Sequence, residues 1–228
     1  RIPDLELPLG ADVREAVCAC YGGVDSYDFH GLETIQCMVE RRGDGEVGVS
    51  SIQALRGDAA WDTLSDGRVD PELFWAAVSR SHTRKPKTED DGDFRADLDT
   101  ARAHVNDPVV YLMDYADGLK ASMFLLSGFL EDFNFSARLG DGAVTSTQMY
   151  LPMPPRRASL ASFFSPLVNN IEPMFETGVA TYPVERTLLT TGQTAFAVDS
   201  LHEDGARLDT PELLIPYAAP EHSSHWRD

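Results

Sequence analysis

The chain has 228 residues, of which 43% are hydrophobic, so it can bury a sizeable core. Its 37 acidic residues outnumber its 19 lysines and arginines and give a formal net charge of −18. This charge argues against nucleic-acid and anionic-membrane partners, because those surfaces would repel the chain. No apolar run approaches the length of a membrane helix. The opening RIPDLELPLGAD has neither a signal-peptide pattern nor a starting methionine, so we expect a chain that was processed or that is part of a longer one.

The surface composition leaves two interpretations open. Only three of the basic residues are lysines, and the rest are arginines. Such a surface is typical either of a protein adapted to salt that screens its self-repulsion, or of an ordinary acidic protein from a GC-rich genome. Cys18, Cys20 and Cys37 form an odd set in apolar surroundings, which favours a reducing cytoplasm and predicts neither a disulfide framework nor a zinc site.

The first predicted elements alternate between strands and helices. VREAVCACY is typical of a strand with Cys18 and Cys20 on the same side, and a double glycine closes it. The next helix contains HGLETIQCMVERR, whose apolar residues recur at helical spacing. The stretch VGVSSIQAL predicts a strand, and DPELFWAAVSRS predicts a helix with Asp70 as N-cap and Pro71 at the first helical position.

The stretch GDGEVG, from Gly43 to Gly48, matches the G-x-G-x-x-G pattern of dinucleotide-binding proteins. A working fingerprint follows a strand and opens a helix, because the pyrophosphate binds free N–H groups at the helix N-terminus. Here a helix precedes the glycines and a strand follows them. We therefore interpret Gly43 as a helix C-cap and the other glycines as the turn into the strand, with no cofactor bound there.

A polar segment, SHTRKPKTEDDGDF, is expected to form a long surface loop after the second helix. From Pro108 onward, apolar residues recur at every second position, which is the period of a strand. The stretches VVYLMDY, LKASMFLLSGFL, FNFSARL and VTSTQMYL predict an antiparallel meander, with tight turns at Asp117-Gly118 and Asp141-Gly142. The apolar content of the second of these strands indicates that both its faces are covered, by helices or by another subunit.

The last third of the chain returns to helices. LASFFSPLVNNIEPMF places five apolar residues between Leu160 and Met174 on one side, and Pro166 and Pro173 are expected to break or kink that helix. PVERTLLTTGQTAFAVDSLHEDG predicts a helix that stops at Gly205.

These elements together predict the fold class. We expect an α+β domain with an open, mostly antiparallel sheet and helices packed on one face. The expected domain covers residues 1–228, with a frayed C-terminal tail from about 218 to 228 that contains His222 and His225.

His30 is the most informative candidate for chemistry. It follows the double-glycine turn at the head of a helix, where a neutral imidazole can face a cleft and exchange protons; a packing or capping role is the alternative. Glu33 could orient its ring, or the two side chains could offer two metal ligands, but no third ligand is evident and no metal is expected. Asp25, Tyr27 and Asp28 crowd the same turn, either as the lining of a polar pocket or as turn-forming residues.

The segment YGGVDSYDFHGLETIQCMVERR resembles the C-terminal domain of the glucose-fructose oxidoreductase and inositol dehydrogenase family. In that family a strand runs into a Gly-Gly turn, followed by an aspartate, a histidine, an acidic residue and a helix that ends near a glycine. Gly22, Gly23, His30, Glu33 and Gly43 match this pattern, and the similarity covers nearly the whole chain.

The chain departs from the family pattern in two respects. Ser26 stands four residues before His30, where the family has its aspartate, and Asp25 and Asp28 are out of register. The family's nucleotide-binding half is also missing, with its glycine loop and the lysine of its Glu-Lys-Pro motif. Lys85-Pro86 lies in a charged loop without a preceding strand and is a poor replacement.

The resemblance implies the substrate-binding and oligomerisation part of an NAD(P)-dependent oxidoreductase that acts on a sugar, a cyclitol or a related hydroxyl compound. His30 would be the general acid or base, with Asp25, Tyr27, Asp28 and Glu33 around the substrate. NAD or NADP would bind mainly outside this chain, so the chain alone is expected to be inactive. The implied partners are a small polyol or sugar and further copies joined through the sheet.

Two alternatives remain open on the sequence. The first is a non-catalytic binding or assembly module that lacks a cofactor domain. The second is a metal-dependent enzyme that uses His30 and Glu33.

Overall fold

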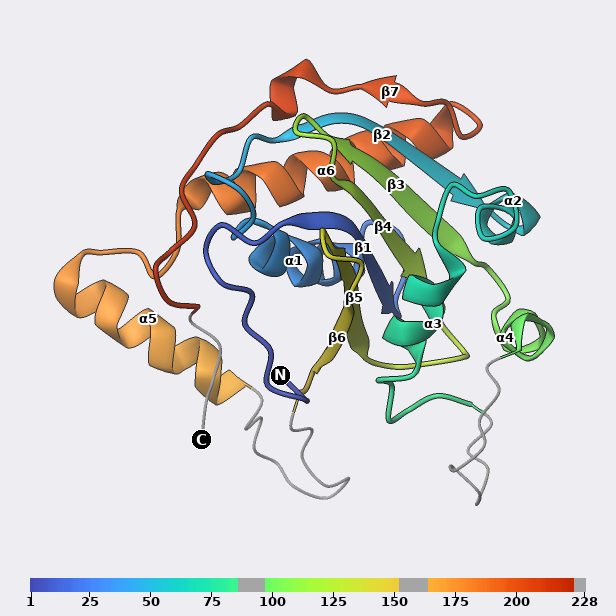
Figure 1. Ribbon diagram of the computed structural model, residues 1–228, viewed down its shortest axis with the longest axis horizontal. Coiled ribbons are helices and arrows are strands. Elements are labelled where there is room, and N and C mark those ends of the chain that lie inside the picture. Colours follow the sequence, from blue (N-terminus) through green and yellow to red (C-terminus); the bar gives the residue numbers. More distant parts are fainter. Residues whose placement is uncertain (86–96, 152–163, 224–228) are drawn as a thin grey trace.

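The computed structural model describes residues 1–85, 97–151 and 164–223. Its centre is an open seven-stranded sheet with the order β6-β5-β1-β4-β3-β2-β7 (Figure 1). The strands are β1 (Val13–Cys20), β2 (Val49–Arg56), β3 (Val109–Tyr115), β4 (Lys120–Leu125), β5 (Phe133–Leu139), β6 (Val144–Met149) and β7 (Leu208–Asp209). All neighbours pair antiparallel except β1 and β4, which are parallel. The predicted open, mostly antiparallel sheet is confirmed.

Helices cover both faces of the sheet, so the expectation of helices on one face is wrong in this respect. The helices are α1 (Asp28–Val39), α2 (Asp58–Asp62), α3 (Pro71–Val78), α4 (Leu98–His104), α5 (Ser165–Thr177) and α6 (Val184–His202), with a short 3-10 helix at Pro211–Leu213. Strand β1 shows the division: Cys18 and Cys20 lie in one core with residues of α1 and α6, and Val17 and Ala19 lie in the other with residues of α2, α3 and α4. Both faces of the central strands are apolar, and each has to be buried.

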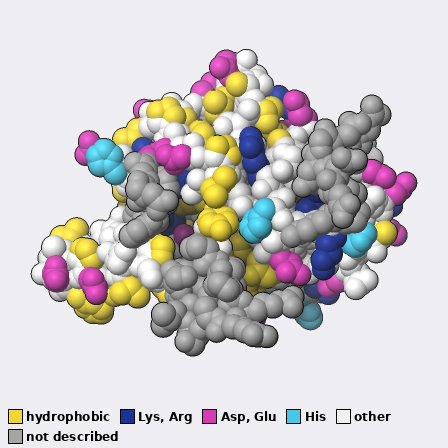
Figure 2. All heavy atoms as spheres, turned by 90° about the horizontal axis from the view of Figure 1, so that it is seen from below, with side chains coloured by type: hydrophobic (Ala, Val, Ile, Leu, Met, Phe, Trp, Pro, Cys, Tyr) yellow, Lys and Arg dark blue, Asp and Glu magenta, His cyan; other side chains and the backbone are white. Residues whose placement is uncertain are grey.

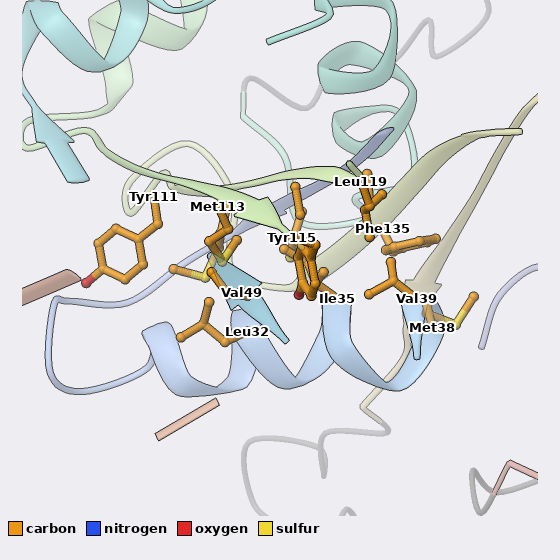
Figure 3. Close-up of a cluster of buried hydrophobic side chains, with 14 of the residues drawn as sticks. Leu32, Ile35, Met38, Val39, Val49, Tyr111, Met113, Tyr115, Leu119 and Phe135 are labelled. Atoms are coloured by element: carbon orange, nitrogen blue, oxygen red, sulfur yellow. The ribbon is translucent and has the colours of Figure 1, made fainter. Parts of the chain in front are cut away.

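The predicted helical periodicity of α1 is confirmed. Leu32 and Ile35 are almost fully buried, and they point toward Tyr111 and Met113 of β3 and Phe135 of β5 (Figure 3). The predicted cap of α3 is also present, since the Asp70 carboxylate accepts a hydrogen bond from the Glu72 N–H at 2.8 Å.

The predicted meander is wrong between its second and third strands. The hairpins β3–β4 and β5–β6 form as predicted, with glycines of positive φ at Gly118 and Gly142. Strands β4 and β5 do not pair, because β1 lies between them. The C-terminal half of β1 is buried on both faces, which an edge position could not provide. Strand β4 consequently ends at Leu125, and the chain passes the end of β1, where the Leu126 N–H donates to the Cys20 carbonyl at 2.7 Å.

Helix α5 projects from the body of the molecule (Figure 1). Pro166 lies in its first turn, and the helix continues past Pro173 to Thr177, so the expected break does not occur. None of its residues is buried. Leu160, which belonged to its predicted apolar side, lies outside the described residues.

The described part of the C-terminal segment contacts the body, so the expected fraying from residue 218 is wrong as far as Ser223. Arg41 is 5% exposed and donates to the carbonyl oxygens of Pro220 and Glu221. A buried guanidinium needs acceptors, and this segment supplies two. Residues 224–228, including His225, lie outside the described residues.

Over the described residues, every helix is too short or too polar to cross a bilayer.

Candidate functional site

A cavity of about 520 Å³ opens beside His30, where strand β1 ends and strand β5 begins. Its walls come from the turn after β1, from helix α1, from the start of β5, from the end of β6, and from the start of α5. Segments from four separate parts of the chain therefore build this cavity. Figure 2 shows one face of the molecule, on which hydrophobic side chains gather in the middle and along the lobe at the left.

His30 lies in the first turn of α1 and is exposed. Its ring packs edge-on against Tyr27 at 5.6 Å and against Phe133 at 5.7 Å, measured between ring centroids. Within the described residues, no hydrogen bond holds either ring nitrogen. An imidazole that is fixed by aromatic edges and keeps both nitrogens for a ligand can accept a hydrogen bond and exchange a proton.

Glu33 lies one turn beyond His30 in the same cavity wall, but its partner is on another helix. The Thr190 hydroxyl of α6 donates to Glu33 Oε1 at 2.7 Å. Within the described residues, no hydrogen bond joins Glu33 to the His30 ring. The carboxyl therefore does not orient the imidazole, and it remains a separate polar group in the cavity wall.

Burial raises the pKa of Glu33, and the Thr190 hydrogen bond and the charge of Arg186 offset this only in part, while the charge of Glu40 adds to it. A carboxyl with a raised pKa binds more protons in the folded state. Its contribution to stability is fully present below the ordinary value of 4.5 and is lost as the pH rises through the raised value.

We therefore expect Glu33→Gln to gain stability relative to the wild type as the pH rises from 4 to 8. Glutamine keeps an acceptor for Thr190 and removes the charge that burial disfavours. Urea unfolding of both proteins at the two pH values measures the difference. A difference that stays constant between them would contradict the expectation.

Asp28 does not line the cavity. It is fully buried, and its carboxylate accepts hydrogen bonds from the N–H groups of Asp25, Ser26 and Phe29 at 2.8 to 3.1 Å. The Tyr111 hydroxyl is a fourth donor at 2.8 Å. Asp28 thus closes the turn between β1 and α1, which corresponds to the turn-forming interpretation.

Of the other two predicted site residues, Tyr27 lines the cavity and Asp25 does not. Tyr27 lines the cavity with His30 and Glu33, and 43% of its side chain is exposed. Asp25 is exposed in a left-handed conformation with φ of 53°, outside the cavity wall. Aspartate tolerates this conformation better than most residues, which explains its place in the turn.

Several cavity residues were missed in the sequence. Thr34 and Cys37 lie four and seven residues after His30, so the helical period places them on the same face, and this signal could have found them. Phe133, Met149 and Leu167 also line the cavity, from β5, β6 and α5. They carry no local signal, because only the tertiary fold brings those segments to His30.

The GDGEVG stretch connects α1 to β2, as predicted. Gly43 is not the C-cap of the helix, because α1 ends at Val39 and Glu40 occupies the cap position. The Glu46 carboxylate accepts hydrogen bonds from the N–H groups of Val47 and Gly48 at 2.9 and 2.8 Å. The turn therefore places its own carboxylate on N–H groups that a pyrophosphate would need, and it does not fit a dinucleotide.

The glycine at position 48 has a packing reason. A Cβ atom there would lie 2.1 Å from the carbonyl oxygen of Leu213, and the φ of Gly48 is 91°. Only glycine fits this approach of two backbones. The G-x-G-x-x-G pattern thus reflects a tight turn around a buried glutamate.

Among the described residues, no group of three or more His, Cys, Asp or Glu side chains is arranged to hold a metal ion. His30 and Glu33 therefore find no third ligand in that part of the chain.

Comparison with known proteins gives a distant likeness to a solved structure. No model of a protein family matches this chain, and no curated protein matches it. The chain is similar to the crystal structure of myo-inositol 2-dehydrogenase from Lactobacillus plantarum, with 10% identity and a TM-score of 0.41. The match covers 88% of this chain and 57% of that one, so this chain spans less than two thirds of its length. A likeness this distant carries no conclusion about activity.

Proposed function

We propose that this chain is the substrate-binding part of an NAD(P)-dependent oxidoreductase that acts on a sugar, a cyclitol or a related hydroxyl compound. The observation that carries the proposal is the placement of exposed His30 in the wall of a cavity of about 520 Å³, with Glu33 in the same wall. Small-molecule sites usually measure about 300 to 1,000 Å³. The motif around His30, which resembles that of the inositol dehydrogenase family, supports the same assignment.

His30 has the central role in this proposal. Its imidazole accepts a hydrogen bond from a substrate hydroxyl and takes up or returns the proton of that hydroxyl. The rings of Tyr21, Tyr27 and Phe133 pack beside it and exclude water from one side of the ligand. Glu33 and Thr34 on the next turn of α1 offer further hydrogen bonds.

The nicotinamide cofactor would accept or supply the hydride. The GDGEVG stretch does not fit it, so the proposal places the cofactor outside this chain. Association of copies through the sheet belongs to the same proposal and stays a prediction.

We expect His30→Ala to weaken binding of myo-inositol or glucose about two- to twelvefold, because one hydrogen bond of about 0.5–1.5 kcal/mol is lost. The side chain is exposed, so the fold should be unaffected. Isothermal titration of the purified chain measures the affinities. His202→Ala is the matched control, because His202 is an exposed histidine in the last turn of α6. Equal affinities of the wild type and His30→Ala would contradict the role of His30.

A non-catalytic binding module is the second candidate, and one observation favours it. The two acidic residues nearest to His30 in sequence are engaged elsewhere, Asp28 with Tyr111 and Glu33 with Thr190. Within the described residues, the imidazole therefore has no hydrogen bond to a carboxylate of the kind that activates many catalytic histidines. The gene sequence upstream of Arg1 separates the two candidates: a strand followed by G-x-G-x-x-G supports the oxidoreductase, and a start codon supports the module.

A further inference from the structure

The walls of the His30 cavity differ in chemistry. Helix α1 presents His30, Glu33 and Thr34, which are the hydrogen-bonding groups on that side. On the other side, the lining residues within the described part of the chain are hydrophobic: Phe133, Met149, Leu151, Phe164 and Leu167. The cavity therefore has one polar wall and one apolar wall.

Three residues of the apolar wall are exposed to water. The side chains of Leu151, Phe164 and Leu167 are 43%, 51% and 54% exposed. Large apolar side chains that converge on a cavity and remain in contact with water mark a surface that gains free energy when an apolar group covers it. Leu167 belongs to α5 and Phe164 is its N-cap residue, and no residue of this helix is buried, so the core of the protein does not include them.

A ligand with hydroxyl groups on every edge suits such a cavity poorly. A free cyclitol can bond to His30 and Glu33 along one edge, but its opposite hydroxyl groups would face Phe164 and Leu167 without partners. A hydroxyl that loses its water and finds no partner costs more free energy than one hydrogen bond on the opposite edge of the ring contributes.

We propose that the substrate is an amphipathic glycoside, in which a sugar ring lies against α1 and an apolar aryl or alkyl group lies against Phe164 and Leu167. The sugar hydroxyls then meet the polar wall, and the apolar group covers the exposed side chains. This inference rests on the proposed function, because it assigns the same cavity and the same role to His30. It adds to the proposed function that the sugar carries an apolar aryl or alkyl group.

The experiment compares phenyl and methyl β-glucosides and β-galactosides by isothermal titration of the full chain. The expected result is that the phenyl glycoside of at least one sugar binds about tenfold or more tightly than its methyl counterpart, since the phenyl ring buries apolar surface that the methyl group cannot reach. Phenol is titrated alongside, and it should bind more weakly than the phenyl glycoside.

Two variants place the apolar group. Leu167→Ser should lower the ratio of phenyl to methyl affinity about threefold or more, because it removes part of the apolar wall. Val168→Ser is the matched control: Val168 is the next residue of α5, is 45% exposed and does not line the cavity, so the ratio should be kept. His30→Ala should weaken both glycosides by a similar factor.

The outcomes separate the two proposals. Equal affinity for phenyl and methyl glycosides would overturn the amphipathic substrate and leave the proposed function standing. Binding of phenol as tightly as phenyl glycoside would also overturn it, because the sugar ring would then contribute nothing. A ratio unchanged by Leu167→Ser would overturn the assignment to α5. Absence of binding by every glycoside, by myo-inositol and by glucose would overturn both proposals.

Discussion

Asp28→Ala is expected to lower the free energy of unfolding by about 3–5 kcal/mol, as measured by urea unfolding. The Asp28 carboxylate accepts four hydrogen bonds in a fully buried position. Without it, the Tyr111 hydroxyl remains buried with no acceptor, and three N–H groups of the turn lose theirs. Leaving buried donors unsatisfied costs about 1–3 kcal/mol each before the turn relaxes.

The same change should weaken ligand binding at the cavity. The turn that Asp28 closes carries Tyr27 and leads directly into His30, so its loss removes the support of both side chains. Tyr111→Phe is the control, because it deletes one of the four donors and should cost only about 1 kcal/mol. If Asp28→Ala costs no more than Tyr111→Phe, the carboxylate does not organise the turn.

Glu46→Ala is the second change with a large expected effect, about 3–5 kcal/mol of unfolding free energy. Arg42 and Glu46 are each 2% exposed, and their side chains form two hydrogen bonds at 2.8 and 3.0 Å. Removing one partner leaves the other charge buried, which costs far more than an exposed ion pair is worth. Asp117 also binds Arg42, so part of the arginine's charge stays paired.

Glu46 also joins three segments of the fold. Gln36 of α1 donates to Glu46 Oε2 at 2.5 Å and to the Tyr217 hydroxyl at 2.8 Å. The carboxylate thus connects the turn to α1 and, through Gln36, to the C-terminal segment. Burial alone would lower the pKa of Arg42, and the hydrogen bonds and charge of Glu46 more than offset this, so the pKa lies above the ordinary value.

Asp44→Ala is the matched control for Glu46→Ala. Asp44 lies in the same glycine turn and is exposed, so its replacement should change the unfolding free energy by no more than about 0.5 kcal/mol. Urea unfolding at neutral pH measures both variants. A Glu46→Ala protein as stable as Asp44→Ala would show that the buried pair does not hold the turn.

The sequence by itself determined the features that depend on neighbours along the chain. Helix periodicity identified the buried stripe of α1, and the alternation of β1 placed Cys18 and Cys20 on one face. The Asp70 cap and the Asp117-Gly118 turn followed from local backbone preferences. The order of helix, glycines and strand was enough to read GDGEVG as a turn, because that motif depends on its local context.

Only the tertiary structure decided which segments meet. The insertion of β1 between β4 and β5 breaks the expected meander, and no local pattern records a pairing between strands about a hundred residues apart. The same holds for the cavity, since Phe133 and Leu167 reach His30 from β5 and α5. Asp28 and Glu33 are both acidic residues close to His30 in the sequence, which does not distinguish their roles. In the fold, Asp28 is buried, bonds to Tyr111 and holds the turn. Glu33 bonds to Thr190 and lines the cavity.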